Sequence, residues 1–78
     1  MNMHVVMYTR TGCHLCDDAW RVLEEARRTH GFELETVDID TSADLVSQHG
    51  NWVPVVAIDG TVRFRGHVNR VLLQRLLN

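Results

Sequence analysis

The sequence predicts a small α/β fold with the element order β-α-β-α-β-β-α, built as a four-stranded mixed sheet with helices on both faces. Three observations lead to this prediction. Short apolar runs alternate with amphipathic segments, which is typical of strands connected by helices. The pair Asp59-Gly60 separates two strand-like runs, as in a two-residue β-hairpin. No repeat, low-complexity run or linker interrupts the 78 residues, so residues 1–78 should form a single domain.

The first half of the chain should form a strand, a helix and a second strand. Residues 3–8 are apolar on both alternating faces, as in a central strand that is covered on both sides. The helix should begin at Gly12 or Cys13 and end at Gly31. Its buried stripe should consist of the apolar residues at helical spacing, namely Leu15, Ala19, Val22, Leu23 and Ala26. Residues 32–39 show a mixed pattern that favours an edge strand, parallel to the first because the crossover is right-handed.

The second half should contain a short helix, the hairpin and a last helix. N-cap residues at 40–42 precede a helical segment over residues 43–49, which Gly50 should end. The hairpin arms should cover residues 55–58 and 61–65. After Gly66, the chain should form a last amphipathic helix whose apolar face consists of Val68, Leu72 and Leu76, with Val71, Leu73 and Leu77 beside them.

Composition and charge exclude several classes of partner. The formal net charge is −2, the estimated pI is about 6.2, and every basic residue is arginine. Such a weakly acidic chain lacks the basic surface of a nucleic-acid binder. No apolar run approaches the roughly 20 residues needed to span a membrane, and no signal peptide is visible. We therefore expect a cytoplasmic monomer without nucleic-acid or membrane partners.

The two cysteines, Cys13 and Cys16, are separated by two residues and lie between a predicted strand and a predicted helix. This arrangement is typical of a thiol–disulfide site. If Cys13 lies at the helix N-terminus, Cys16 follows about one turn later on the same face, and the unpaired N–H groups favour thiolate at Cys13. Two inert buried thiols are the structural alternative. A zinc site is disfavoured because no second cysteine pair follows, so we expect no bound metal or cofactor.

The element order and three motifs together resemble the thioredoxin fold in its smallest form, and most of all a short bacterial branch of the glutaredoxin family. The motifs are residues 8–16, the run Trp52-Val53-Pro54 and the pair Arg65-Gly66. The resemblance covers nearly the whole chain and implies an enzyme, a dithiol oxidoreductase. In it, Cys13 would be the attacking cysteine and Cys16 the resolving one.

The resemblance also implies substrate contacts around the cysteines. Pro54 matches the family's cis-proline, and the Val53 backbone would bind an extended substrate or glutathione. Arg10 matches a basic position that helps to bind the glutathione carboxylate. The roles of two neighbours stay open. His14 either stabilises the thiolate or simply faces solvent, and Trp52 forms either a wall of the active-site groove or a cap on the core edge.

The sequence departs from the family pattern at positions that affect glutathione binding more than the redox chemistry of the cysteines. His14-Leu15 replaces the common Pro-Tyr between the cysteines, and Trp52 replaces a small hydroxyl residue. Of the usual glycine-rich acidic motif before the last helix, Gly66 remains but the acidic pair does not. We therefore expect a small thiol–disulfide oxidoreductase that reduces protein or glutathione mixed disulfides, with glutathione as a possible co-substrate. The alternatives are a non-catalytic interaction module and a dithiol donor dedicated to one protein partner.

Overall fold

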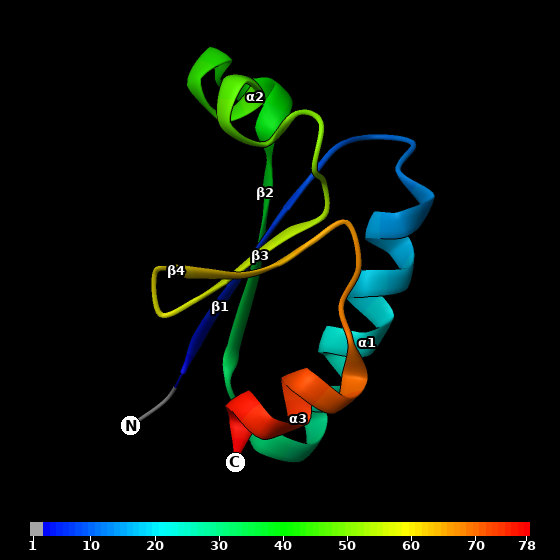
Figure 1. The fold of residues 1–78 in the computed structure, drawn as a ribbon, viewed down its shortest axis with the longest axis vertical. Coiled ribbons are helices and arrows are strands. Elements are labelled where there is room, and N and C mark those ends of the chain that lie inside the picture. Colours follow the sequence, from blue (N-terminus) through cyan, green and yellow to red (C-terminus); the bar gives the residue numbers. More distant parts are fainter. Residues whose placement is uncertain (1–2) are drawn as a thin grey trace.

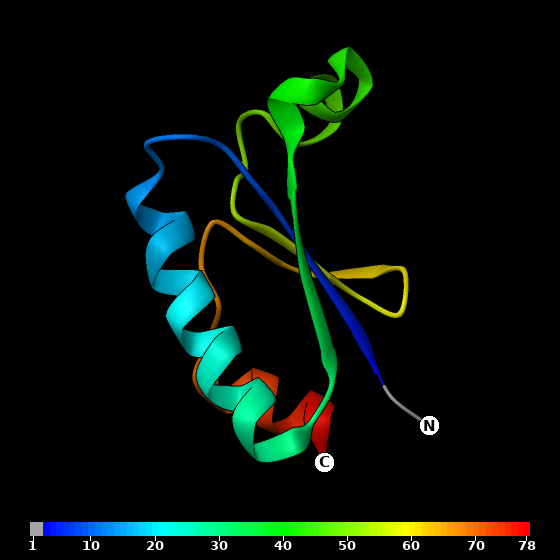
Figure 2. The same cartoon turned by 180° about the vertical axis from the view of Figure 1, so that it is seen from behind.

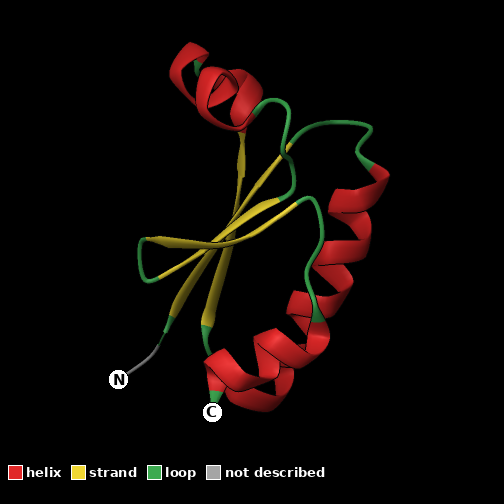
Figure 3. Cartoon of the chain, viewed as in Figure 1, coloured by secondary structure: helices red, strands yellow, loops and turns green. Residues whose placement is uncertain are grey.

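The computed structural model describes residues 3–78 and contains, within them, one four-stranded sheet and three α-helices (Figure 3). The elements follow in the order β1 (His4–Thr9), α1 (His14–His30), β2 (Glu33–Asp38), the short 3₁₀ helix η1 (Ile39–Thr41), α2 (Ala43–His49), β3 (Val55–Ile58), β4 (Thr61–Arg65) and α3 (Arg70–Leu77). The predicted β-α-β-α-β-β-α order is confirmed.

The strands are ordered β2-β1-β3-β4 across the sheet. β1 pairs parallel with β2 and antiparallel with β3, and β3 pairs antiparallel with β4, so the sheet is mixed as predicted. β1 is central and β2 is an edge strand. Asp59 and Gly60 both have positive φ, at 50° and 85°, which is the backbone that a two-residue hairpin of Asp-Gly type requires.

Two of the helices cover one face of the sheet, and the third reaches its other side only at the end of the strands. Figures 1 and 2 show α1 and α3 side by side against one face, while α2 lies beyond the end of β2. The His49 ring of α2 contacts the ring of Tyr8 at a centroid distance of 4.5 Å, on the side of β1 away from buried Met7. The core lies between the sheet and the α1–α3 layer, and its buried members are Val5, Met7, Cys16, Ala19, Leu23, Phe32, Val56, Ile58, Phe64, Val68 and Leu73.

Helix α1 begins at His14, one or two residues later than predicted. Cys13 keeps an extended backbone, with φ −93° and ψ 104°, and acts as the N-cap. Its Sγ accepts a hydrogen bond from the backbone N–H of Cys16 at 3.1 Å, so a sulfur takes the place of the usual capping oxygen. At the other end Gly31 adopts the left-handed conformation, with φ 72°, and stops the helix as predicted.

Three leucines that were predicted to be buried are exposed instead. The buried face of α1 runs through Cys16, Ala19 and Leu23, and Leu15 lies beside this face with 54% of its surface exposed. The last helix, α3, starts only at Arg70, after the N-cap residue Asn69, and the row that includes Leu72 and Leu76 is not its buried face. Val68 is buried, but it lies in the loop before the helix. Within the helix Leu73 is buried, and Leu72 and Leu76 face solvent.

Within residues 3–78, no helix combines the length and the apolar character that crossing a membrane would require.

Candidate thiol–disulfide site

The strand pairing brings three distant segments to one end of the sheet. Tyr8 pairs with Val55, and Val55 pairs with Arg65. The cysteine loop leaves the sheet just after Tyr8, the Trp52-Val53-Pro54 run enters it just before Val55, and Gly66 follows Arg65. Figure 1 shows these three loops gathered between the sheet and the N-terminal end of α1. The motifs that were singled out from the sequence therefore meet in one site.

Cys13 and Cys16 are paired as a disulfide in this structure, with their Cα atoms 5.2 Å apart. The two residues differ in exposure, since Cys13 is half-buried and Cys16 is only 2% exposed. Cys13 caps a helix of 17 residues, so its sulfur lies against unpaired N–H groups and the positive end of the helix dipole. This environment stabilises a thiolate at Cys13 in the reduced form. The Cys13 residue is thus the more exposed of the pair, and Cys16 is screened from solvent.

The Trp52-Val53-Pro54 run forms the second side of the site. The Val53–Pro54 peptide bond is cis, as the resemblance implied. Pro54 is buried, Val53 packs partly against the core alongside Cys13, and Trp52 is 58% exposed. This exposure argues against the interpretation of Trp52 as a cap on the core. The carbonyl of Pro54 accepts a hydrogen bond from the N–H of Gly66 at 2.7 Å, which fastens the run to the end of β4.

His14 and Leu15, the two residues between the cysteines, are both exposed. His14 is the first residue of α1. Leu15 borders a small cavity of about 50 Å³ that also contacts Gly66 and His67. Leu15 and Trp52 are both exposed apolar side chains, and they belong to segments that the strand pairing brings to the same end of the sheet, which gives the site a partly apolar rim.

Arg10 lies in the loop between β1 and α1, but its side chain is already paired. Its Nη2 donates to Asp40 Oδ1 at 2.6 Å, its Nε to Asp40 Oδ2 at 3.3 Å, and its Nη1 to the carbonyl oxygen of Gly50 at 3.3 Å. The hydrogen bond from Arg10 lowers the pKa of Asp40, and the same bond raises the pKa of Arg10. The family resemblance implied a glutathione contact for Arg10, and its pairing with Asp40 was not predicted.

The partnership of Arg10 and Asp40 could have been found from the strand pattern. β1 and β2 are parallel, and Thr9 pairs with Asp38 at the ends of the two strands. The residues that follow these two strands therefore leave the sheet together. Arg10 comes directly after Thr9, and Asp40 follows Asp38 by two residues, so an Arg–carboxylate pair was accessible from the predicted crossover.

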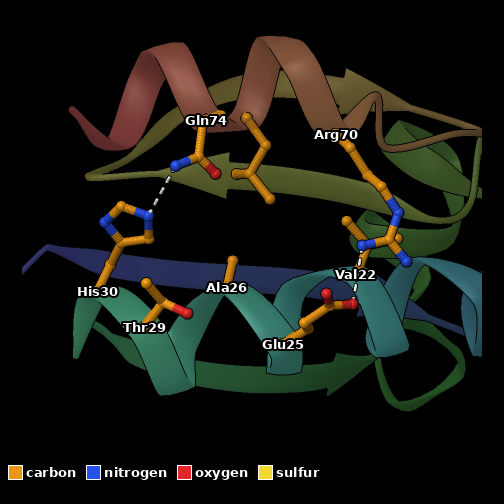
Figure 4. Close-up of a pocket in the computed structure, with 8 residues that line it drawn as sticks. Val22, Glu25, Ala26, Thr29, His30, Arg70 and Gln74 are labelled. Atoms are coloured by element: carbon orange, nitrogen blue, oxygen red, sulfur yellow. Dashed lines mark hydrogen bonds and ion pairs between the residues drawn. The ribbon is translucent and has the colours of Figure 1, made fainter.

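Two further cavities border α1. Figure 4 shows a cavity of about 90 Å³ between α1 and α3, with an apolar floor that includes Val22 and Ala26. Arg70 donates to Glu25 at 2.8 Å across it, and Gln74 lies 3.3 Å from His30. A more open hollow of about 450 Å³ borders Cys16 from the β2 side. Neither of these two cavities is lined by Cys13, Trp52 or Val53.

Within the described residues 3–78, no three His, Cys, Asp or Glu side chains are grouped as metal ligands. A parallel β-α-β unit with a Cys-x-x-Cys at the helix start, followed by a cis-proline and a β-hairpin, defines a thioredoxin-fold protein. Such a fold with this cysteine pair supports thiol–disulfide oxidoreductase chemistry.

The family can be stated more closely. The glutaredoxin-like domain family (DUF836) matches residues 4–78, and the chain belongs to this family. A probable thioredoxin of Methanothermobacter thermautotrophicus is 31% identical over 81 aligned positions, which cover 100% of this chain and 95% of that protein.

Two solved structures support the same assignment. Protein Ne2328 of Nitrosomonas europaea has a TM-score of 0.87 at 25% identity and covers 100% of this chain and 94% of its own. Protein XcR50 of X. campestris has a TM-score of 0.78 at 32% identity, with 94% and 93% covered. The expected glutaredoxin-like, thioredoxin-fold assignment is confirmed.

Proposed function

We propose that this protein reduces disulfide bonds of protein substrates through the Cys13–Cys16 dithiol. The observation that carries the proposal is the asymmetry of the pair. Cys13 is accessible and caps the N-terminus of α1, and Cys16 lies one turn later, 2% exposed, with its Cα 5.2 Å from that of Cys13. Reducing conditions, such as those of a cytoplasm, would keep the pair cycling rather than permanently oxidised.

The reaction proceeds by two exchanges. The Cys13 thiolate attacks one sulfur of the substrate disulfide, a mixed disulfide forms, and the other substrate sulfur leaves as thiolate and takes up a proton. Cys16 then loses its proton and attacks Cys13 Sγ. The substrate sulfur that was bonded to Cys13 leaves as thiolate, and the Cys13–Cys16 disulfide forms. Two electrons pass from the protein dithiol to the substrate. An external thiol such as glutathione, or a reductase, returns them by the reverse exchange.

Protein disulfides are the better substrate class for this site. The acidic pair that would hold the amino group of glutathione is missing, and Arg10 is paired with Asp40. The apolar rim at Leu15 and Trp52 suits an extended polypeptide that lies across Cys13. The free Val53 backbone next to it would pair with such a chain as an added strand does. Turnover of small glutathionylated substrates should be weaker than in a typical dithiol glutaredoxin.

A redox titration tests the proposal against a non-catalytic interaction module. The protein is equilibrated in glutathione buffers of graded potential, and free thiols are counted by the mass shift after alkylation. We expect one two-electron transition, roughly between −180 and −270 mV, the span from disulfide isomerases to thioredoxin. A dithiol that neither oxidises in this range nor reduces insulin disulfides would instead favour the binding module.

A further inference from the structure

Arg10 joins three segments that are far apart in the sequence. It belongs to the loop that carries Cys13, it faces the carboxylate of Asp40 in η1 with two of its nitrogens, and its third nitrogen reaches the carbonyl of Gly50 after α2. A guanidinium supplies five donors in one rigid plane, so it can bind both carboxylate oxygens and a carbonyl at once, whereas the single nitrogen of an ammonium group does not match a carboxylate with two parallel hydrogen bonds. The three hydrogen bonds thus make Arg10 a cross-link between the cysteine loop and the end of α2.

Gly50 is a tightly held anchor for this cross-link. Its N–H donates to the carbonyl of Val46 at 2.8 Å, and the N–H of Trp52 donates to His49 at 2.9 Å. A Cβ atom at Gly50 would lie only 2.6 Å from the Val46 carbonyl oxygen, so the turn has no room for a side chain. The carbonyl that Arg10 contacts therefore cannot shift without moving the residues that follow it.

The residues that follow Gly50 are Trp52, Val53 and Pro54. At their other end, Pro54 is fastened to Gly66 by the 2.7 Å hydrogen bond. The exposed Trp52 and half-buried Val53 thus lie between the turn at Gly50, which Arg10 contacts, and the hydrogen bond of Pro54 with Gly66. Loss of the Arg10 contact would loosen the first end of this segment, where the hydrogen bonds of Gly50 to Val46 and of Trp52 to His49 would remain, and the sheet and both cysteines would keep their own supports.

We propose that Arg10, with Asp40 as its partner, is a positioning residue that holds the Trp52–Val53 segment beside Cys13 for the protein substrate, and is not a glutathione ligand. This inference rests on the proposed function. A glutathione carboxylate could reach the guanidinium only by displacing a carboxylate that already makes two charge-assisted hydrogen bonds with it.

The test compares Arg10→Gln, Arg10→Lys, Asp40→Asn and the double variant Arg10→Gln/Asp40→Asn. Steady-state insulin reduction gives kcat and KM, and a glutathionylated cysteine peptide serves as the second substrate. We expect Arg10→Gln and Asp40→Asn each to raise KM for insulin about fivefold, the effect of losing one partly exposed charged pair, and to leave kcat unchanged. The double variant should be no worse than either single variant, because both remove the same interaction. Lysine should rescue only in part.

The Arg70–Glu25 pair provides the matched control. It also joins an arginine and a glutamate from different elements, at 2.8 Å, and it lies at the cavity between α1 and α3 (Figure 4). Arg70→Gln and Glu25→Gln should leave KM for insulin unchanged. Unfolding curves of all variants show which ones fold. If Arg10→Gln does not fold, the comparison is made with Asp40→Asn and Arg10→Lys.

Two results would overturn the inference. If Asp40→Asn increases turnover of the glutathionylated peptide while Arg10→Gln decreases it, Arg10 is a glutathione ligand that Asp40 restrains. If KM for insulin is unchanged in both variants, the cross-link does not position the substrate segment.

Failure of the proposed function itself is distinguishable from failure of this inference. If the unsubstituted protein reduces neither substrate, amide hydrogen exchange still reports on the Trp52–Val53 segment. We expect faster exchange at these two amides in Arg10→Gln and Asp40→Asn than in Arg70→Gln. Equal exchange rates in all three variants would contradict the positioning role.

Discussion

Cys13 and Cys16 have the same side chain but different surroundings, and their chemistry should differ accordingly. The Cys13 sulfur caps α1 and accepts the N–H of Cys16, whereas Cys16 is screened from solvent and is followed by the carboxylate-bearing Asp17. Helix N–H groups stabilise negative charge on the first sulfur, and burial and a nearby carboxylate disfavour it on the second. Nucleophilic attack should therefore begin at Cys13.

Single serine substitutions would separate the two roles. With Cys16→Ser, the mixed disulfide between Cys13 and the substrate cannot be resolved, so stable covalent adducts should accumulate. Cys13→Ser should form almost none and lose reductase activity. Each variant is exposed to a protein disulfide substrate, and adducts are counted by intact mass. Faster adduct formation by Cys13→Ser would show that the nucleophile is Cys16 instead.

At the scale of elements, the pairing of β1 with β2 is reinforced by one histidine. His4 at the start of β1 lies between two carboxylates of the edge strand, with Nδ1 3.1 Å from Glu33 and Nε2 3.1 Å from Glu35. Asp59 of the hairpin accepts the backbone N–H of the same residue at 2.9 Å. The hydrogen bond to Glu33, followed by that to Glu35, raises the pKa of His4 above its ordinary value.

This bridge should make stability depend on pH. Because the folded-state pKa of His4 is raised, its contribution is fully present below the ordinary pKa of about 6.5 and is lost as the pH rises through the raised value. The free energy of unfolding of His4→Asn should thus fall further below that of the unsubstituted protein at pH 5.5 than at pH 8.5. Urea denaturation at both pH values measures this, with the exposed His67→Asn as control. If the difference in unfolding free energy is the same at both pH values, His4 does not make the stability depend on pH.

The local elements were largely predictable, and the through-space contacts were not. Alternating apolar residues, Gly31 and Asp59-Gly60 act over a few neighbouring residues, so the sequence pattern determines strands, caps and the hairpin. The exposure of Leu15 could not be predicted, because it depends on which part of α1 overhangs the sheet. The Arg10–Asp40 contact spans 30 residues of sequence and depends on where β1 and β2 end together.

The candidate site divides in the same way. The cysteine pair and the cis-proline belong to short motifs that can be recognised from a few consecutive residues, and the structure brings both to one end of the sheet. Glutathione contacts were inferred from single matching positions such as Arg10. A single position carries no information about which neighbour already occupies its hydrogen-bonding groups.

At the scale of the whole molecule, one thin core supports the site. A domain of this length has a stability of about 4–12 kcal/mol, so single core contacts matter. Leu23 is fully buried in the middle of α1 and packs in the same core cluster as Cys16, Met7 and Leu73. Truncation of the Leu23 side chain should consequently destabilise the entire fold, including the cysteine loop.

Leu23→Ala should lower the free energy of unfolding by about 2–5 kcal/mol, because it removes buried methyl groups and leaves a cavity. Leu72→Ala is the matched control, since Leu72 is 49% exposed and its truncation should change stability by only about 0.5 kcal/mol. Chemical denaturation followed by circular dichroism compares the two variants. Equal losses would mean that the core does not lie where the structure has it.

Helix α1 also sets the distance between the two ends of the molecule. Its 17 residues span about 25 Å, with Cys13 capping one end, while His30 at the other end lies against Gln74 of α3. Figure 1 places the C-terminal end beside this far end of α1. A biotin or resin tether attached after Asn78 would therefore leave the sulfur facing outward. A Cys16→Ser protein immobilised in this orientation would serve as bait, on which physiological substrates remain covalently bound until a reductant elutes them.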